Sequence, residues 1–164
     1  MHDTPQEKAL GQSNTVVGKM FMTERFMLRG IATGAAYADL DALGLAVSID
    51  VPISGVIQSA TYYDLDDEGL QVDLWLLNDK PTDQTDNSAV AFIDHDLIKV
   101  IPGGRLQFTA FADAANGQFS PLNTIGLAYV APRRKLWIQA QARGALNIAA
   151  GNLPMFQLCI LSDE

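Results

Sequence analysis

An acidic turn offers the first residues with the chemistry to hold an ion. Asp64, Asp66 and Glu68 precede Gly69 at the spacing of positions 1, 3, 5 and 6 of an EF-hand calcium loop. Position 12 of such a loop should be a bidentate glutamate, but this chain has Trp75 there. The residues that follow alternate like a strand, whereas an EF-hand continues as a helix. The pattern favours a solvated hairpin turn, and a loose calcium site is the alternative.

A second polar cluster, Asp94-His95-Asp96, has the residue types of a metal or acid–base site. Jelly-roll enzymes of the cupin type surround one metal ion with several histidines, but this chain contains only His2 and His95. One histidine in the body of the protein cannot complete such a site. The cluster instead predicts a short helical turn over Asp94–Val100, capped by Asp94.

Nucleophilic catalysis has little support in the sequence. Cys159 lies in an apolar stretch, where a thiol is usually buried and inert. The chain has no Gly-x-Ser-x-Gly elbow, and Gly103-Gly104-Arg105 lacks the lysine and the hydroxyl of a phosphate-binding loop. We therefore expect no catalytic residue, no metal ligand and no cofactor, and a protein that is not an enzyme.

Candidates for contact with another protein include a basic run and two tryptophans. Arg133-Arg134-Lys135 opens a strand, so it is either a solvated strand end or a contact for an acidic protein surface. Trp137, like Trp75, falls on the side of its strand opposite the aliphatic residues. That position fits a second core face, a subunit contact or a platform for sugar stacking.

A segment rich in methionine and phenylalanine supplies the other candidates for partner binding, which are Phe21, Met22 and Phe26. Methionine adapts well to irregular apolar surfaces. The segment Phe21–Leu28 is either the first core strand or part of a grip on a partner.

Charge is distributed unevenly along the 164 residues, whose net charge is −8. The net charge is −11 over Ala36–Lys99 and +4 over Val100–Leu161. Either acidic residues decorate turns while basic ones decorate strands, or the two parts attract neighbouring copies or a partner. Nucleic acid is not an expected partner, because a sequence-independent binder needs a basic face. Polar residues and Gly151 interrupt the longest uncharged stretch, Gly144–Ser162, so we expect no membrane helix there.

Period-two alternation predicts strands through most of the chain. The alternating stretches are Leu45–Ile49, Ile53–Tyr63, Val72–Leu77, Leu106–Phe111, Leu136–Arg143 and Phe156–Ile160. Turn residues separate them at Asp64–Gly69, Asn78–Pro81, Pro102–Gly104, Asn116-Gly117 and Ala131-Pro132.

Helix is expected only over Ala35–Leu43 and Asp94–Val100. Residues 1–22 have little periodicity and predict a flexible amino-terminal arm. Residues 23–164 form one domain of ordinary size. Many short strands with turn signals predict an all-β fold, a jelly-roll-like β-sandwich with an extended arm.

The run GLQVDLWLLNDKPTDQTDNSAVAFIDHDLIKVIPGG, Gly69–Gly104, resembles a widespread group of small virion structural proteins of tailed bacteriophages. Leu136–Ala140 and Leu158–Asp163 extend the resemblance, which covers Val56–Asp163, about two-thirds of the chain. Some members of that group are head decoration or cement proteins. The resemblance carries no catalytic residues.

The resemblance implies a jelly-roll body that binds the outside of a capsid, often as a dimer or trimer. The expected partners are then the major capsid protein and further copies of the chain. The expected location is the capsid exterior, after synthesis in the host cytoplasm, which a single cysteine suits. The alternative is a carbohydrate- or receptor-binding sandwich from a phage tail or fibre.

Overall fold

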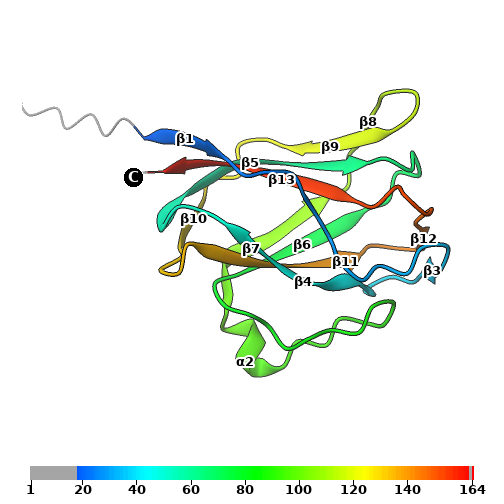
Figure 1. Ribbon diagram of the computed structural model, residues 1–164, viewed down its shortest axis with the longest axis horizontal. Coiled ribbons are helices and arrows are strands. Elements are labelled where there is room, and N and C mark those ends of the chain that lie inside the picture. Colours follow the sequence, from blue (N-terminus) through cyan, green and yellow to red (C-terminus); the bar gives the residue numbers. More distant parts are fainter. Residues whose placement is uncertain (1–17, 163) are drawn as a thin grey trace, which may run out of the picture.

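Two antiparallel sheets stack as a sandwich in the computed structural model, which describes residues 18–162 and residue 164 (Figure 1). Sheet 1 contains, in spatial order, β1 (Lys19–Met22), β13 (Met155–Ser162), β5 (Ser54–Asp64), β9 (Gln118–Leu122) and β8 (Ala112–Asp113). Two further short strands belong to it: β2 (Phe26–Met27) pairs with β13, and β10 (Leu127–Val130) pairs with β5. Sheet 2 contains β4 (Ala42–Asp50), β11 (Lys135–Ala142), β6 (Val72–Leu77) and β7 (Val100–Phe108). A small ladder joins β3 (Ala36–Tyr37) to β12 (Leu146–Asn147).

Strand pairing is nested along the chain. The first strand, β1, pairs with the last, β13; β4 pairs with β11; β5 pairs with β9 and β10; and β6 pairs with β7. Successive pairs alternate between the two sheets, which is the order produced when one long antiparallel hairpin folds over itself. This order is that of a jelly roll, so the fold expected from the sequence is confirmed.

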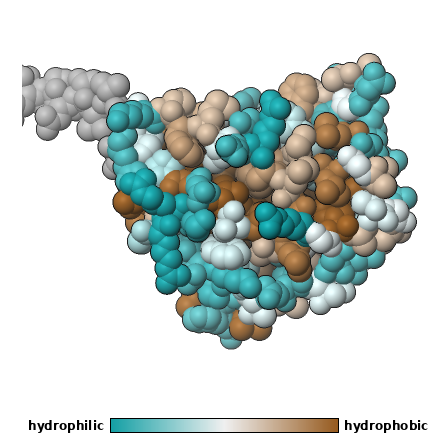
Figure 2. Space-filling view, in the orientation of Figure 1, coloured by the Kyte–Doolittle hydropathy of each residue, from teal (hydrophilic) through white to brown (hydrophobic). Residues whose placement is uncertain are grey.

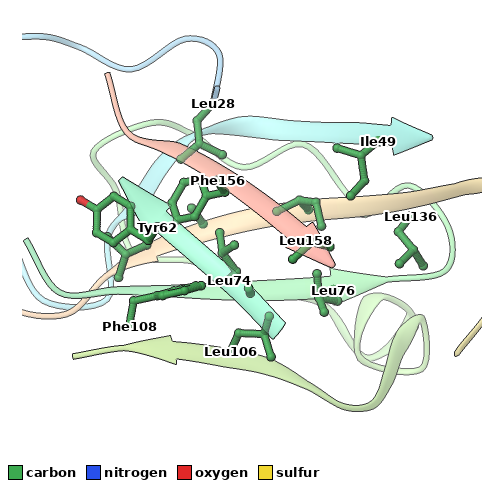
Figure 3. Packing of buried hydrophobic residues seen from close by; sticks show 14 of the residues in the cluster. Leu28, Ile49, Tyr62, Leu74, Leu76, Leu106, Phe108, Leu136, Phe156 and Leu158 are labelled. Carbon is green, nitrogen blue, oxygen red and sulfur yellow. The ribbon is translucent and has the colours of Figure 1, made fainter. Parts of the chain in front are cut away.

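The core lies between the sheets and is built from alternate residues of each strand. On β13, for example, Phe156, Leu158 and Ile160 are fully buried. The ring of Tyr62 on β5 stacks on Phe156 at 4.8 Å and meets the Phe108 ring of β7 edge-on at 5.8 Å (Figure 3). This aromatic cluster joins the two sheets, and aromatic pairs contribute about 0.5–1.5 kcal/mol beyond their buried area.

The outer face of sheet 2 is covered by the long connection between β6 and β7, residues 78–99. This connection contains α2 (Asp94–Leu97), the short helical turn that the sequence predicts, and it lies along the lower side of the molecule in Figure 1. Phe92 meets the Trp75 ring edge-on at 5.6 Å, and the Lys80 ammonium lies 6.0 Å from the centre of the Trp137 ring. Both tryptophans are therefore half-buried under this segment.

The helix expected over Ala35–Leu43 is wrong. These residues form β3, a turn and the start of β4. Leu40 has a φ of 72°, which no right-handed helix contains, and the Asp41 carboxylate accepts the N–H of Ala38 at 2.8 Å. This hydrogen bond between a side chain and the backbone competes with the backbone hydrogen bonds of a helix. The first residues of β4 are also buried in the sandwich, which favours a strand.

The turn expected at Pro102–Gly104 is also wrong, because these residues lie inside β7. Gly103 has a φ of 73°, and the register of β6 against β7 shifts at this point. A Cβ on Gly104 would lie 2.7 Å from the carbonyl oxygen of Ile101. The Pro-Gly-Gly sequence therefore produces a bulge within a strand, where glycine allows a close backbone approach.

The expected arm overlaps the sheet at its last residues. Most of it lies outside the described residues, but Lys19–Met22 form β1, whose residues pair in register with Ser162 to Cys159 of β13. Four residues that the sequence assigns to the arm therefore belong to sheet 1.

A truncation series measures the contribution of β1. A chain that begins at Thr23 should unfold at a lower temperature than one that begins at Gly18, because it exposes the edge of β13. We expect a difference on the order of 1–2 kcal/mol, or about 3–6 °C, by thermal melting monitored by circular dichroism. Equal melting temperatures would show that β1 adds nothing to the sandwich.

Two tyrosines provide a test of the core. The Tyr62 hydroxyl is buried with no hydrogen-bond partner among the described residues, and burial raises the pKa of this group well above its usual value. The Tyr37 hydroxyl instead donates to the Asp86 carboxylate at 3.0 Å. Tyr62→Phe should therefore be neutral or stabilising, whereas Tyr37→Phe should cost about 1 kcal/mol, both measured by urea unfolding. A loss of more than about 1 kcal/mol for Tyr62→Phe would mean that its hydroxyl is paired.

Candidate interaction surface

The outer face of sheet 1 is uncharged and largely apolar, interrupted by the polar residues Ser59, Thr61 and Gln157, and no described helix or strand covers it. Opposite residues of an antiparallel pair share a face, so the register of β1 on β13 places Met20 beside Leu161 and Met22 beside Cys159. These positions alternate with the buried row of β13 and therefore point outward. We name this surface the methionine face; its residues are Met20, Met22, Met27, Val56, Tyr63, Phe119, Val130, Met155, Cys159 and Leu161.

All four methionines in the described part of the chain lie on the methionine face. The outward positions of β1, β2, β5, β9, β10 and β13 include no acidic or basic residue. A cation reaches the face from the β1–β2 connection, where the Arg25 guanidinium lies 5.2 Å from the centre of the Tyr63 ring. Figure 2 views the sandwich in the orientation of Figure 1, with sheet 1 above and sheet 2 below, and shows hydrophobic residues across the middle of this side of the molecule.

A groove of about 440 Å³ lies where β1 meets the turn between β10 and β11. Phe21 and Arg134, which the sequence proposes separately as partner-binding residues, both line it. Lys19, Asp50 and Glu164 are among the other residues of this end groove. Phe21 and Arg134 line the same groove because of the nested strand pairing. The first and last strands are neighbours, and their free ends lie beside the β10–β11 turn.

The basic run at this end is paired with acidic residues of the same chain. Arg133 contacts Asp79 at 3.2 Å and Lys135 contacts Asp50 at 2.9 Å. Arg134, with a φ of 56° in the turn, contacts Glu164 at 3.1 Å. All three pairs are exposed, so each contributes little to stability and exchanges readily for a pair with another molecule.

The other predicted binding residues lie elsewhere. Phe26 is half-buried, and its ring stacks on the core residue Phe156 at 5.9 Å, so it belongs largely to the core. Trp137 is on sheet 2, on the opposite side of the sandwich from the methionine face. Of the residues proposed from the sequence, the structure brings together Phe21 and Arg134 at the end groove, whereas Met22 lies on the methionine face.

The acidic turn is held by its own backbone. Asp64 is buried, and its carboxylate accepts the N–H groups of Asp66, Gly69 and Leu70. Asp66 in turn accepts the N–H of Ala149 at 2.7 Å. Within residues 18–162 and 164, no group of three or more His, Cys, Asp or Glu side chains is arranged to hold a metal ion.

The Asp94-His95-Asp96 cluster forms α2, but the cap differs from the prediction. Ile93 occupies the capping position without a side-chain bond, and Asp94 lies in the first turn. Asp96 is the structural residue, buried and bonded to the Thr82 N–H and the Lys99 ammonium, both at 3.0 Å. Burial raises the pKa of Asp96, but the bonds from Lys99 and Thr82 outweigh it and lower the pKa below its usual value.

Cys159 lies on the methionine face and is half-buried, whereas the sequence predicts a buried thiol. Its Sγ lies 3.0 Å from the Sδ of Met20. The sequence carried a signal for this face: Met155, Cys159 and Leu161 are apolar although they alternate with the buried row of β13. Apart from Gln157, the outward row of β13 is therefore apolar between Met155 and Leu161, which suits contact with another molecule.

A scan of protein-family models, a search of curated proteins and a search of solved structures each find no match to this chain. In the part of the chain that the structure describes, no helix combines the length and apolarity needed to cross a bilayer.

A double-mutant cycle measures the pairing of Arg134 with Glu164. We expect a coupling energy below about 1 kcal/mol for Arg134→Ala and Glu164→Ala, because both side chains are partly exposed to water. Urea unfolding of the four chains gives the value. A coupling well above 1 kcal/mol would mean that Arg134 is committed to the fold and is not free to contact a partner.

Proposed function

We propose that this chain is a structural protein of a tailed-phage virion, a decoration or cement protein that binds the outside of the head. In this role it joins neighbouring major-capsid subunits and acts without catalysis. The observation that carries the proposal is the uncharged methionine face, which no helix or strand of residues 18–162 covers and which continues into the end groove lined by Phe21 and Arg134.

The character of this surface supports a protein partner. Soluble monomers rarely expose a large contiguous apolar patch, and such patches usually mark interaction sites. Methionine side chains are flexible and polarisable, so they adapt to a partner of irregular shape. The exchangeable arginine pairs at the end groove add contacts for acidic groups on the capsid.

Stabilisation of the shell follows from mass action. A protein that binds the assembled shell, but not separated subunits, stabilises the shell by its binding free energy. Symmetry repeats each contact over the whole head, so a modest affinity per copy suffices. Broad, shallow contacts suit this role better than a deep pocket.

Two matched variants test the contact surface. Met27→Lys alters the methionine face, and Leu97→Lys alters α2 on the other side of the sandwich; the two native side chains are 52% and 51% exposed. Recombinant protein is added to shells of the source phage that lack it and is recovered with the shells by sedimentation. We expect Met27→Lys to bind at least about tenfold more weakly, because its ammonium loses water at an apolar contact. Leu97→Lys should bind normally.

Equal binding by both variants, or equal loss by both, would contradict the proposed contact surface. Immunogold labelling of intact virions tests the location. Label on the head agrees with the proposal, whereas label confined to the tail would overturn it in favour of a tail or fibre module.

A further inference from the structure

The free edge of sheet 1 has the pattern of a self-pairing strand. We infer that β1 pairs antiparallel with β1 of a second copy, about a two-fold axis centred on Phe21, to form one continuous sheet. This inference goes beyond the proposed function: it gives a geometry to the self-association expected from the sequence, and it does not depend on binding to a capsid.

Backbone geometry determines which groups of β1 are free. The N–H of Thr23 donates to the carbonyl oxygen of Leu158 on β13 at 3.0 Å. Residues along a strand direct their backbone groups alternately to the two sides, so Lys19 and Phe21 also face β13. The N–H and C=O groups of Met20 and Met22 therefore face away from β13, where the described residues supply no neighbouring strand.

These free groups are self-complementary. In an antiparallel pair centred on Phe21, Met20 of one copy is opposite Met22 of the other, and each donates to and accepts from its counterpart. Every free backbone group of the two residues then finds a partner. The two Phe21 side chains become a close, non-hydrogen-bonded pair, which brings their rings together.

Side chains along the edge favour the same arrangement. Met20, Phe21 and Met22 are 63%, 36% and 58% exposed, a large apolar surface for three successive residues. The antiparallel register also places Lys19 of one copy opposite Thr23 of the other, next to Glu24 and its opposite charge. Pairing would join the two methionine faces into one, because Met20 and Met22 of both copies lie on the same side of the continuous sheet.

The two edge strands of sheet 2 and the end strand β8 of sheet 1 are protected against such pairing. Leu45 on β4 donates its N–H to Arg29 at 2.7 Å, and Ala42 donates to Ser88 at 2.8 Å, so neighbouring segments cover β4. β7 contains Pro102, and β8 is two residues long. Proline, coverage and shortness are usual defences of edge strands. Among the described residues β1 has no proline and no covering segment, and its four residues make it longer than β8.

Disulfide trapping tests the register directly. In a Cys159→Ser background, Phe21→Cys places two thiols opposite each other at a separation that a disulfide spans. Lys19→Cys is the control, because its two copies would lie four residues apart along the strands, about 13 Å. Under mild oxidation we expect a dimer band for Phe21→Cys on a non-reducing gel and none for Lys19→Cys. Equal cross-linking of both, or of neither, would overturn the pairing.

A proline variant tests the hydrogen bonds without a cysteine. The Met22 N–H faces the free edge, so Met22→Pro keeps the bonds between β1 and β13 but removes two of the four bonds between the copies. Analytical ultracentrifugation should show self-association weakened by at least about tenfold, with an unchanged melting temperature. Self-association that Met22→Pro leaves unchanged would place the contact elsewhere and overturn the inference. Shell binding without self-association would leave the proposed function intact.

Discussion

Burial of alternate residues between the two sheets is the constraint on which the rest of the structure depends. Tyr62, Phe108 and Phe156 close the interior from three strands, and the rows that include them point inward. Because side chains of a strand alternate, the opposite rows must point outward. In sheet 2, the connection between β6 and β7 covers the outward tryptophans. In sheet 1, no described helix or strand covers the outward row, which is largely apolar. The difference between the two faces is the basis of the proposal that the methionine face binds a partner.

Buried carboxylates account for part of the acidic excess in the first half of the chain. Asp64 and Asp96 accept backbone N–H groups in their turns, and Asp86 accepts the N–H groups of Ala32 and Gly44. Asp73, fully buried on β6, is held by Arg105 and Arg143. These groups stabilise loops and one sheet face, and the arginines come from the basic half of the chain. The charge asymmetry of the sequence is thus satisfied partly within one molecule.

The fold was largely predictable, because the strongest strands alternate clearly and their order leaves few arrangements. β9 and β10 were missed: β9 contains Pro121 and β10 is short, and both become strands through pairing with β5. The surface was predictable in part. Phe21 and Arg134 were candidates from residue type alone, but only the nested pairing places them at one groove. The uncovered outward row was not predictable, since strand periodicity does not reveal which face another segment covers.

Neighbouring first and last strands also decide where foreign sequence is tolerated. Lys19 is opposite Ser162, so the first and last strands of the described chain end side by side, next to the end groove (Figure 1). Asp64 is opposite Gln118, which places the β8–β9 turn at the far end of the sandwich. An epitope or enzyme inserted in that turn would project away from the end groove. The jelly-roll order thereby separates the end of the sandwich where β1 begins and β13 ends from an opposite end that can carry added sequence.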